Sequence, residues 1–256
     1  MTWVKPLCYH RCMVPIRLTC LCLLLALCPA AMAGPGELVF VAATNHNMPL
    51  SRFRNGELVD GILKDLGDAI AQRMGLQVRY VSAPAKRVGE FLVSGRADGV
   101  CFVLPRWLPG AFNWSQPLIP DSGVLVSRTE APPVRALSDL ANKPVGTVLG
   151  YSYSMIESEL GRAFVREDAS TMELNISKML HGRMQYAIMG RMNAEYLMHA
   201  DPQHKLRIDF EFDPYMAQCA FSLKSTVPFG DIQRAIGSLA SDGSVARLLK
   251  RYNGAP

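Results

Sequence analysis

The chain has 256 residues, of which 49% are hydrophobic and 19% are charged, and this composition is typical of a globular protein. The formal net charge of +5 falls to +2 beyond residue 33, where 24 basic residues face 22 acidic ones. This near balance excludes the strongly basic surface of a nucleic-acid-binding protein, so no nucleic-acid partner is expected.

The first 33 residues have the pattern of a cleaved export signal. Three cations and no acid precede an apolar segment over residues 18–27, and Ala31-Met32-Ala33 follows it. Small residues at the first and third of these positions suit signal peptidase, and the apolar segment is too short to span a bilayer comfortably. We therefore expect residues 1–33 to be removed and the mature protein to reside in the periplasm. The sequence leaves open whether translation starts at Met1 or at Met13.

Strands and helices alternate in the first half of the remaining chain. Apolar runs predict strands that are buried on both faces, and segments with apolar residues spaced by three or four predict helices. Asp60 is expected to cap the first helix, while Gly75 and Gly95 end the two helices. This order predicts a parallel sheet with right-handed connections. The strands are expected at residues 38–43, 76–81 and 100–103, and the helices at residues 60–74 and 84–95.

The strand at residues 100–103 leads into a turn that is rich in aromatic and cationic side chains. Ligands of open α/β sheets bind beyond the carboxyl ends of the strands. Arg106, Trp107, Trp114 and Ser115 follow this strand, so we expect them at a ligand site. The alternative is a surface loop that two packed tryptophans hold in place.

The second half repeats the alternation and indicates a second lobe of similar plan. No stretch of it has the composition of a linker between independent domains. Strands are expected at residues 123–127, 144–149, near Phe164, at 186–189 and at 216–223, and helices at residues 137–141, 155–160, 172–180, 228–239 and 244–252.

Only two cysteines, Cys101 and Cys219, lie outside the first 28 residues. No CxxC spacing or histidine cluster accompanies them, so neither a metal nor a cofactor is expected. The residues themselves leave two states open, one disulfide or two buried free thiols.

Short motifs at five places along the chain carry a family resemblance. They are Gly61-Ile-Leu-Lys-Asp-Leu66, Leu92-Val-Ser-Gly-Arg-Ala-Asp98, Phe112-Asn-Trp-Ser-Gln-Pro117, Leu137-Ser-Asp-Leu140 with Pro144-Val-Gly146, and Ser241-Asp-Gly-Ser-Val-Ala246. In this order and spacing the chain resembles the family 3 extracellular solute-binding proteins, the periplasmic receptors typified by those for polar amino acids. The resemblance covers nearly all of residues 34–255.

The resemblance implies an α/β, two-lobed fold of the type II periplasmic-binding-protein kind. Each lobe would be a mostly parallel sheet flanked by helices, and two crossover strands would join the lobes. Lobe 1 would hold residues 34–121 and 214–256, and lobe 2 residues 122–213. The same layout places Cys101 and Cys219 on adjacent strands, where an exported protein is expected to oxidise them to a disulfide.

The implied function is the binding of a small polar or anionic organic solute between the lobes, which close around it. The protein would be a monomer without enzyme activity that delivers the solute to a membrane permease of a transporter. Two alternatives stay open: a ligand-sensing subunit for a membrane signalling protein, and a periplasmic enzyme of the cyclic-acid dehydratase kind.

Two positions depart from the family pattern. Leu108 stands where the amino-acid receptors have an arginine for the ligand carboxylate, and Gly190 followed by Arg191 stands where they have an acid for the ligand ammonium. Burying an unpaired ligand charge costs several kcal/mol, so we expect an organic acid or an amino-acid derivative in place of a free amino acid. The expected ligand-binding residues are Asn45, His46, Arg106, Trp107, Trp114, Ser115, Gly150, Tyr151, Ser152 and Arg191.

Several candidate residues also have structural or catalytic interpretations. His46 has no partner in the sequence that indicates a metal or catalysis, and it is expected as an exposed turn histidine. A serine hydrolase would need Ser152 with Asp201 and His204, but the Gly-x-Ser-x-Gly turn is incomplete. A dehydratase would need a carboxylic acid in the cleft, for which Glu90 and Glu195 are nominal candidates.

Overall fold

The computed structural model describes residues 1–3 and 36–252, so nearly all of the predicted export signal lies outside the described residues. The chain divides into residues 1–34 and a compact body that follows. In the part of the chain that is described, no helix has both the length and the apolarity needed to cross a bilayer.

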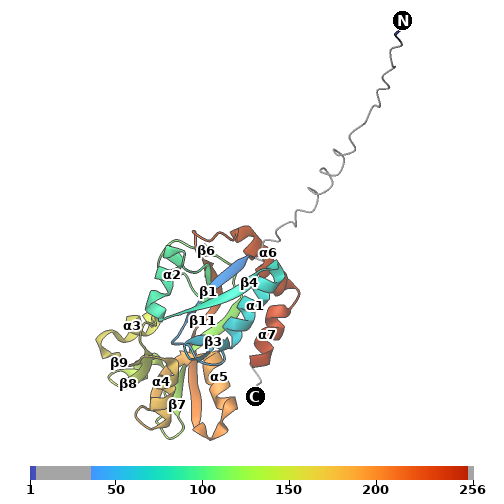
Figure 1. The fold of residues 1–256 in the computed structure, drawn as a ribbon. Coiled ribbons are helices and arrows are strands. Elements are labelled where there is room, and N and C mark those ends of the chain that lie inside the picture. Colours follow the sequence, from blue (N-terminus) through green and yellow to red (C-terminus); the bar gives the residue numbers. More distant parts are fainter. Residues whose placement is uncertain (4–35, 253–256) are drawn as a thin grey trace. The chain divides into compact units, whose positions relative to one another are not determined.

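One sheet runs through the body (Figure 1), and nine strands of the described residues form it in the order β4-β1-β5-β11-β7-β10-β8-β9, with β6 paired to β11. A separate two-stranded hairpin is made by β2 and β3. The strands are β1 Glu37–Ala43, β2 Arg52–Arg54, β3 Glu57–Asp60, β4 Gln77–Ala83, β5 Gly99–Val103, β6 Asn113–Trp114, β7 Ile119–Arg128, β8 Pro144–Val148, β9 Val165–Ala169, β10 Tyr186–Gly190 and β11 Leu206–Phe221.

The sheet has two mostly parallel parts, as predicted. In the first part β4 and β5 both run parallel to β1, and in the second part β10 and β9 both run parallel to β8. The parts are joined by β7 and β11, which pair antiparallel to each other. Because β11 is 16 residues long, it pairs with β7 along its first part and with β5 at its end. These two strands are the two crossovers.

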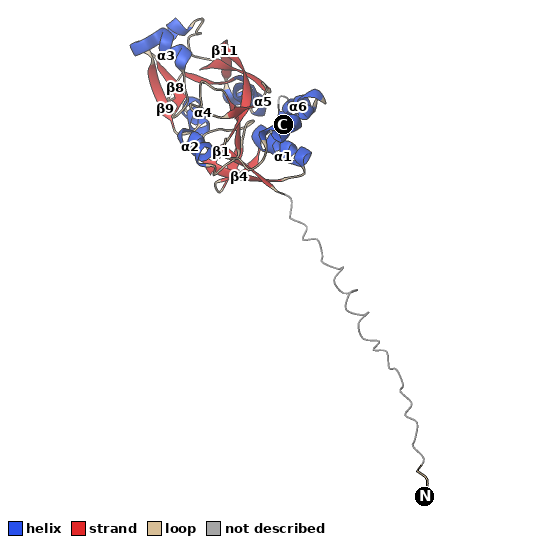
Figure 2. Ribbon diagram, turned by 90° about the horizontal axis from the view of Figure 1, so that it is seen from above, coloured by secondary structure: helices blue, strands red, loops and turns tan. Residues whose placement is uncertain are grey.

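Helices cover the sheet on its outer faces, and Figure 2 shows α1 beside α6 at one side of the body and α3 at the far side. The alternation of side chains along a strand sends neighbours to opposite faces, and Leu38 and Phe40 of β1 accordingly pack in one cluster while Val39 and Val41 pack in another. The helices are α1 Ile62–Met74, α2 Val88–Ser94, α3 Ser154–Leu160, α4 Met172–Leu180, α5 Arg191–Ala200, α6 Phe229–Ser241 and α7 Ser244–Tyr252.

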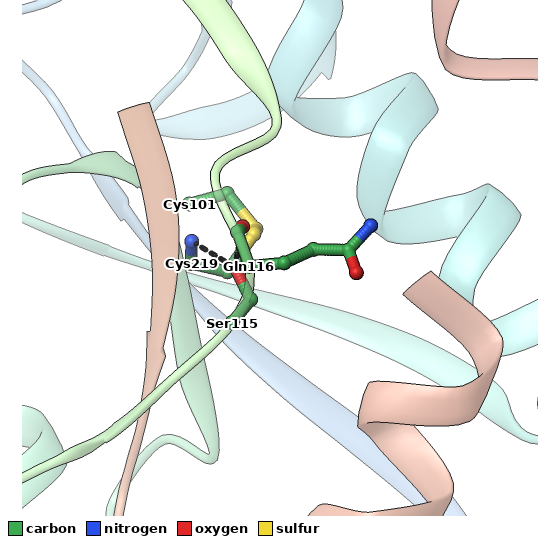
Figure 3. Close-up of a disulfide and its surroundings, with 4 residues drawn as sticks. All are labelled: Cys101, Ser115, Gln116 and Cys219. Carbon is green, nitrogen blue, oxygen red and sulfur yellow. Dashed lines mark hydrogen bonds between the residues drawn. A yellow bond between two sulfur atoms is a disulfide. The ribbon is translucent and has the colours of Figure 1, made fainter. Parts of the chain in front are cut away.

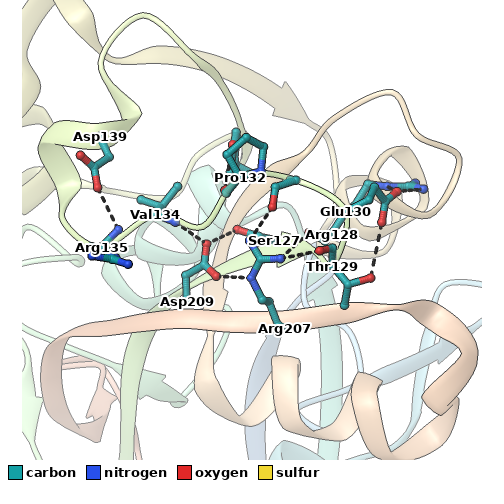
Figure 4. Close-up of polar contacts among 12 residues, drawn as sticks. Ser127, Arg128, Thr129, Glu130, Pro132, Val134, Arg135, Asp139, Arg207 and Asp209 are labelled. Atoms are coloured by element: carbon teal, nitrogen blue, oxygen red, sulfur yellow. Dashed lines mark hydrogen bonds and ion pairs between the residues drawn. The ribbon is translucent and has the colours of Figure 1, made fainter.

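A polar network holds the outer end of the β7–β11 pair (Figure 4). The Asp209 carboxylate accepts hydrogen bonds from the Ser127 hydroxyl at 2.6 Å, the Val134 N–H at 2.9 Å and the Arg207 guanidinium at 2.5 Å. The same guanidinium donates to the Thr129 carbonyl at 2.8 Å. Since these bonds tie side chains of β11 to the end of β7 and the segment after it, they fix the start of the long crossover strand.

Three features differ from the sequence prediction. The hairpin of β2 and β3 and the helix α5 were not predicted, because the hairpin is short and rich in charge and α5 follows β10 without an intervening loop. The last predicted strand, residues 216–223, begins ten residues earlier as β11. Pro214 predicts a break in the strand, but a register shift between Phe212 and Tyr215 leaves Pro214 out of the pairing with β7, so its missing N–H is not needed there.

The start of α1 also differs from the prediction. Gly61, with φ of 114°, occupies the capping position, and no side chain caps the helix. Asp60 instead accepts a hydrogen bond from the Gly61 N–H at 2.8 Å. A side chain at position 61 would meet the Leu50 carbonyl oxygen at 2.5 Å, so close approach of the preceding loop requires glycine here.

Candidate functional site

A cavity of about 220 Å³ lies where the crossover strands join the two parts of the sheet. Its walls come from β1 and β5 in the first part, from the end of β10 and residues 150–156 in the second part, and from β7 and β11 between them. The sequence analysis predicts a ligand site beyond the carboxyl ends of the strands, and this cavity is the candidate for it.

Five rings form a continuous series along the cavity wall, which we call the aromatic band. The ring centroids of Tyr151 and His46 are 5.8 Å apart, those of His46 and Phe102 are 6.1 Å apart, and those of Phe102 and Tyr215 are 6.2 Å apart. Trp107 completes the band at 4.9 Å from Tyr215. These spacings are those of favourable edge-to-face and tilted pairs, so the band also holds its own rings in place.

His46 and Tyr151 join the two sides of the cavity through a hydrogen bond of 2.7 Å between Nδ1 and the hydroxyl. Burial lowers the pKa of His46 to about 4 and raises the pKa of Tyr151, so both are neutral at neutral pH. The expectation of an exposed turn histidine is therefore wrong, because His46 is partly buried among the lining residues.

Asp213 is the one charged side chain among the described residues that line the cavity. Arg106 does not line it; its guanidinium donates to the Asp213 carboxylate at 2.6 Å and is 44% exposed. Leu108, which replaces the arginine of the family pattern, lines the cavity as a buried apolar side chain. Arg106, the cation that was expected to pair with an anionic ligand, is therefore not part of the cavity wall.

Asp121 on β7 is a buried carboxylate directly behind the lining. It accepts hydrogen bonds from the Met192 N–H at 3.1 Å and the Tyr215 hydroxyl at 3.2 Å. Burial raises its pKa to about 6. A Cβ at Gly190 would lie 2.7 Å from its Oδ2, so the bare glycine makes room for this carboxylate. Sequence reasoning missed Asp121, although a lone acid at the start of an apolar strand is the signal that marks it.

The Cys101–Cys219 disulfide links β5 to β11 beside the cavity (Figure 3), which agrees with the expectation from the resemblance. Ser115 is buried next to it; its hydroxyl accepts from the Cys219 N–H at 2.9 Å and donates to the Gln116 carbonyl at 2.8 Å. Trp114 packs against Phe112, with centroids 6.3 Å apart. Ser115 and Trp114 therefore brace the strands and do not line the cavity.

The structure brings five of the ten predicted ligand residues into the cavity wall. Asn45, Arg106 and Arg191 lie outside the wall together with Trp114 and Ser115. Arg191 pairs with Glu195 at 2.9 Å and with Glu211. The five predicted residues that line the cavity are His46, Trp107, Gly150, Tyr151 and Ser152.

Contacts across the cavity tie the loop after β1 to the second part of the sheet. The Asn193 amide on α5 donates to Asn47 Oδ1 at 2.8 Å and to the Met48 carbonyl at 3.1 Å. The Met172 N–H at the start of α4 donates to the Asn45 carbonyl at 3.1 Å. Asn45 thus positions the loop through its backbone.

The candidate catalytic residues do not meet at the cavity. His204 pairs with Asp201 at 3.2 Å in the segment after α5, and neither lines the cavity that holds Ser152. Glu90 is ion-paired on the surface of α2, and Glu195 pairs with Arg191. The acids and the histidine that these two interpretations named, Glu90, Glu195, Asp201 and His204, all lie outside the described cavity wall.

The fold is that of the two-lobed periplasmic binding proteins, and the resemblance seen in the sequence is confirmed at this level. No protein-family model and no curated protein matches the sequence. Solved structures match it along most of the body at low sequence identity, among them an ancestral arginine-binding protein bound to arginine, 20% identical over 86% of this chain and 99% of its own, with a TM-score of 0.71.

Three of these structures illustrate the likeness. An amino acid ABC transporter substrate-binding protein from Streptococcus pneumoniae, bound to L-arginine, is 19% identical over 85% of this chain and 94% of its own, with a TM-score of 0.70. The GluR0 ligand binding core in complex with L-glutamate is 18% identical over 87% and 100%, with a TM-score of 0.72. An ancestral amino-acid-binding protein, a precursor of cyclohexadienyl dehydratase, is 17% identical over 85% and 95%, with a TM-score of 0.71.

Proposed function

We propose that this protein binds a small organic solute in the cavity between two lobes and delivers it to a transporter from the periplasm. Lobe 1 comprises residues 34–121 and 214–256, and lobe 2 comprises residues 122–213. The observation that carries the proposal is the cavity itself, because both parts of the sheet and both crossover strands contribute to its wall.

Closure of the lobes is the proposed mechanism. Two hydrogen bonds would join the proposed lobes, one between His46 and Tyr151 and one that the Asn193 amide donates to Asn47. A solute that contacts both lobes binds the closed conformation more tightly than the open one, and this difference in affinity shifts the population toward closure. The crossover strands β7 and β11 would bend as the hinge.

Binding without chemical conversion is favoured over catalysis. A general acid or base must reach the reacting group directly or through one water, and the candidate acids Glu90 and Glu195 do not line the cavity. The likeness to substrate-binding proteins of ABC transporters supports a role in transport. A sensing role for a membrane signalling protein is the alternative, since it uses the same closure.

The test is a thermal-shift screen of the purified protein against amino acids, amines, organic acids and neutral aromatic compounds, followed by small-angle X-ray scattering. A ligand at 100 times its Kd should raise Tm by about 5–10 °C and reduce the radius of gyration. Conversion of a stabilising compound into product would contradict the proposal in favour of an enzyme. Stabilisation without any compaction would contradict the closure mechanism.

A further inference from the structure

We infer that the cavity takes an organic cation, an amine or ammonium compound with a compact apolar body and no carboxylate. The inference rests on the proposed function and names the chemical class of its ligand. It stands on the charge of the cavity wall, on the aromatic band, on two unusual backbone positions and on the place of Arg106.

The charge of the described cavity lining is negative. Asp213 is the one charged side chain in the described lining, and Asp121 lies behind Tyr215 and Gly190. The side chains and N–H groups that contact Asp121 are neutral. An anion in the cavity would meet the Asp213 carboxylate, with Asp121 behind the lining, and no lysine or arginine of the described wall, whereas a cation would gain a counter-charge.

The aromatic band supplies the second binding element for a cation. The face of an aromatic ring carries partial negative charge and attracts ammonium groups, most strongly for tryptophan. Trp107, Phe102 and Tyr215 supply three aromatic rings to the cavity wall that also contains Asp213. His46 is neutral, so it adds no opposing charge. The same rings exclude water from the apolar body of a ligand.

The backbone at two of these residues is held in a rare conformation. Among the described non-glycine residues with positive φ, only Phe102 at 64° and Asp213 at 47° lie inside strands. Such positions cost energy and persist where the surroundings impose them, commonly at binding sites. The Cys101 disulfide holds the strand next to Phe102, and β11 changes register around Asp213. Both left-handed positions therefore belong to residues of the cavity wall.

Arg106 shows that this corner of the cavity accepts a cation. Its guanidinium pairs with Asp213 at 2.6 Å and lies 5.6 Å from the ring centroid of Trp107. Arg106 is half exposed and outside the lining, so a ligand ammonium inside the cavity would compete with it for the same carboxylate. Removing Arg106 should strengthen the binding of a cation, whereas it should weaken the binding of an anion.

The experiment compares compounds that share one ring and differ in charge. Isothermal titration of the purified protein with 2-phenylethylamine, 2-phenylethanol, 3-phenylpropionate and phenylalanine separates cation, neutral, anion and zwitterion. We expect the amine to bind at least about ten-fold more tightly than each of the other three, because one charge contact is worth about that factor. Choline and tetramethylammonium test the same site without a ring.

Three variants test whether the amine binds beside Asp213 and Trp107. Asp213→Asn should weaken amine binding about ten-fold or more, and asparagine tolerates the left-handed backbone at this position. Trp107→Leu keeps apolar bulk but removes the ring face, and should weaken it about three-fold or more. Arg106→Gln should strengthen it. Thermal unfolding of each variant without ligand verifies that the fold is kept.

The outcomes separate this inference from the proposed function. The inference is overturned if 3-phenylpropionate or phenylalanine binds more tightly than the amine. It is also overturned if Asp213→Asn binds the amine as tightly as the wild type. Neither result contradicts the proposed function of solute binding. The inference is likewise overturned, and the proposed function kept, if none of these six compounds binds while a compound of another class in the thermal-shift screen binds and compacts the protein. Failure of every class in that screen overturns the proposed function as well.

Discussion

His46 and Asp121 are two buried ionisable residues whose pKa values shift in opposite directions on folding. Burial lowers the pKa of His46 from 6.5 to about 4, so its neutral form stabilises the fold above pH 6.5, and this contribution is lost as the pH falls toward 4. Burial raises the pKa of Asp121 from 3.8 to about 6, so its charge destabilises the fold above pH 6, and protonation relieves this as the pH falls toward 4.

Two single substitutions should therefore change the acid stability in opposite senses. From pH 7 to pH 4.5, His46→Gln should lose less unfolding free energy than the wild type, because its side chain no longer takes up a proton on unfolding. Asp121→Asn should lose more unfolding free energy than the wild type, because asparagine cannot take up the proton that stabilises the folded wild type as the pH falls. Urea denaturation at both pH values measures the two differences. Equal pH dependence of the two variants would contradict the assignment.

Arg106 and Phe102 show how far a residue's role depends on its surroundings. The sequence predicts that Arg106 and Trp107 share the ligand site, yet only Trp107 lines the cavity, because the guanidinium turns to Asp213. Phe102 belongs to a strand expected to be buried on both faces, but its left-handed backbone places it in the cavity wall. Both outcomes depend on β11, which follows more than 100 residues later in the chain.

At the scale of elements, β5 and β11 are held together by the Cys101–Cys219 disulfide, which closes a loop with a sequence separation of 118. A cross-link of this kind removes conformations from the unfolded chain, and long loops gain most in the chain-entropy description. The same strands carry Phe102 and Tyr215 of the aromatic band. The disulfide therefore supports both stability and the shape of the cavity.

Replacing both cysteines, as Cys101→Ala with Cys219→Ala, should lower the unfolding free energy by about 2–5 kcal/mol. Urea denaturation with and without a reducing agent measures this. Reduction should destabilise the wild type by a similar amount and leave the double variant unchanged, which serves as the control. If the reducing agent leaves the unfolding midpoint of the wild type unchanged, the result contradicts the presence of the disulfide in solution.

The whole molecule is organised by a sheet whose two parts meet at β7 and β11. Helix α5 of the second part reaches the loop after β1 through Asn193, whose amide donates to Asn47 and Met48. In the proposed mechanism this contact, made by a residue of the cavity wall, belongs to the closed arrangement. Loss of this contact should lower the population of the closed form and should change the unfolding free energy little.

We therefore expect Asn193→Ala to weaken binding of any ligand found by the screen, with a change in unfolding free energy below about 1 kcal/mol. Scattering of the ligand-saturated variant should show a larger radius of gyration than that of the wild type. His199→Ala is the control, because His199 lies on the same helix, is exposed, and has its ring hydrogen-bonded to the Glu195 carbonyl of that helix. Similar affinity losses in both variants would count against a role in closure.

The sequence by itself determined the strands and helices with strong patterns. The helices at residues 172–180 and 244–252 match α4 and α7 residue for residue, since their apolar spacing and capping residues are local signals. It also predicted that Trp107 and Tyr151 lie at one cleft, because residues after parallel strands collect at one edge of a sheet, and both residues line the cavity.

Tertiary structure alone decided which charges the cavity contains. Asp121 and Asp213 belong to the crossover strands, and their side chains reach the cavity region only through the β7–β11 pairing and its register shifts. A one-residue shift of register turns a side chain to the other face of a strand. Since that register is set by contacts between segments far apart in the chain, no local pattern of residues could specify it.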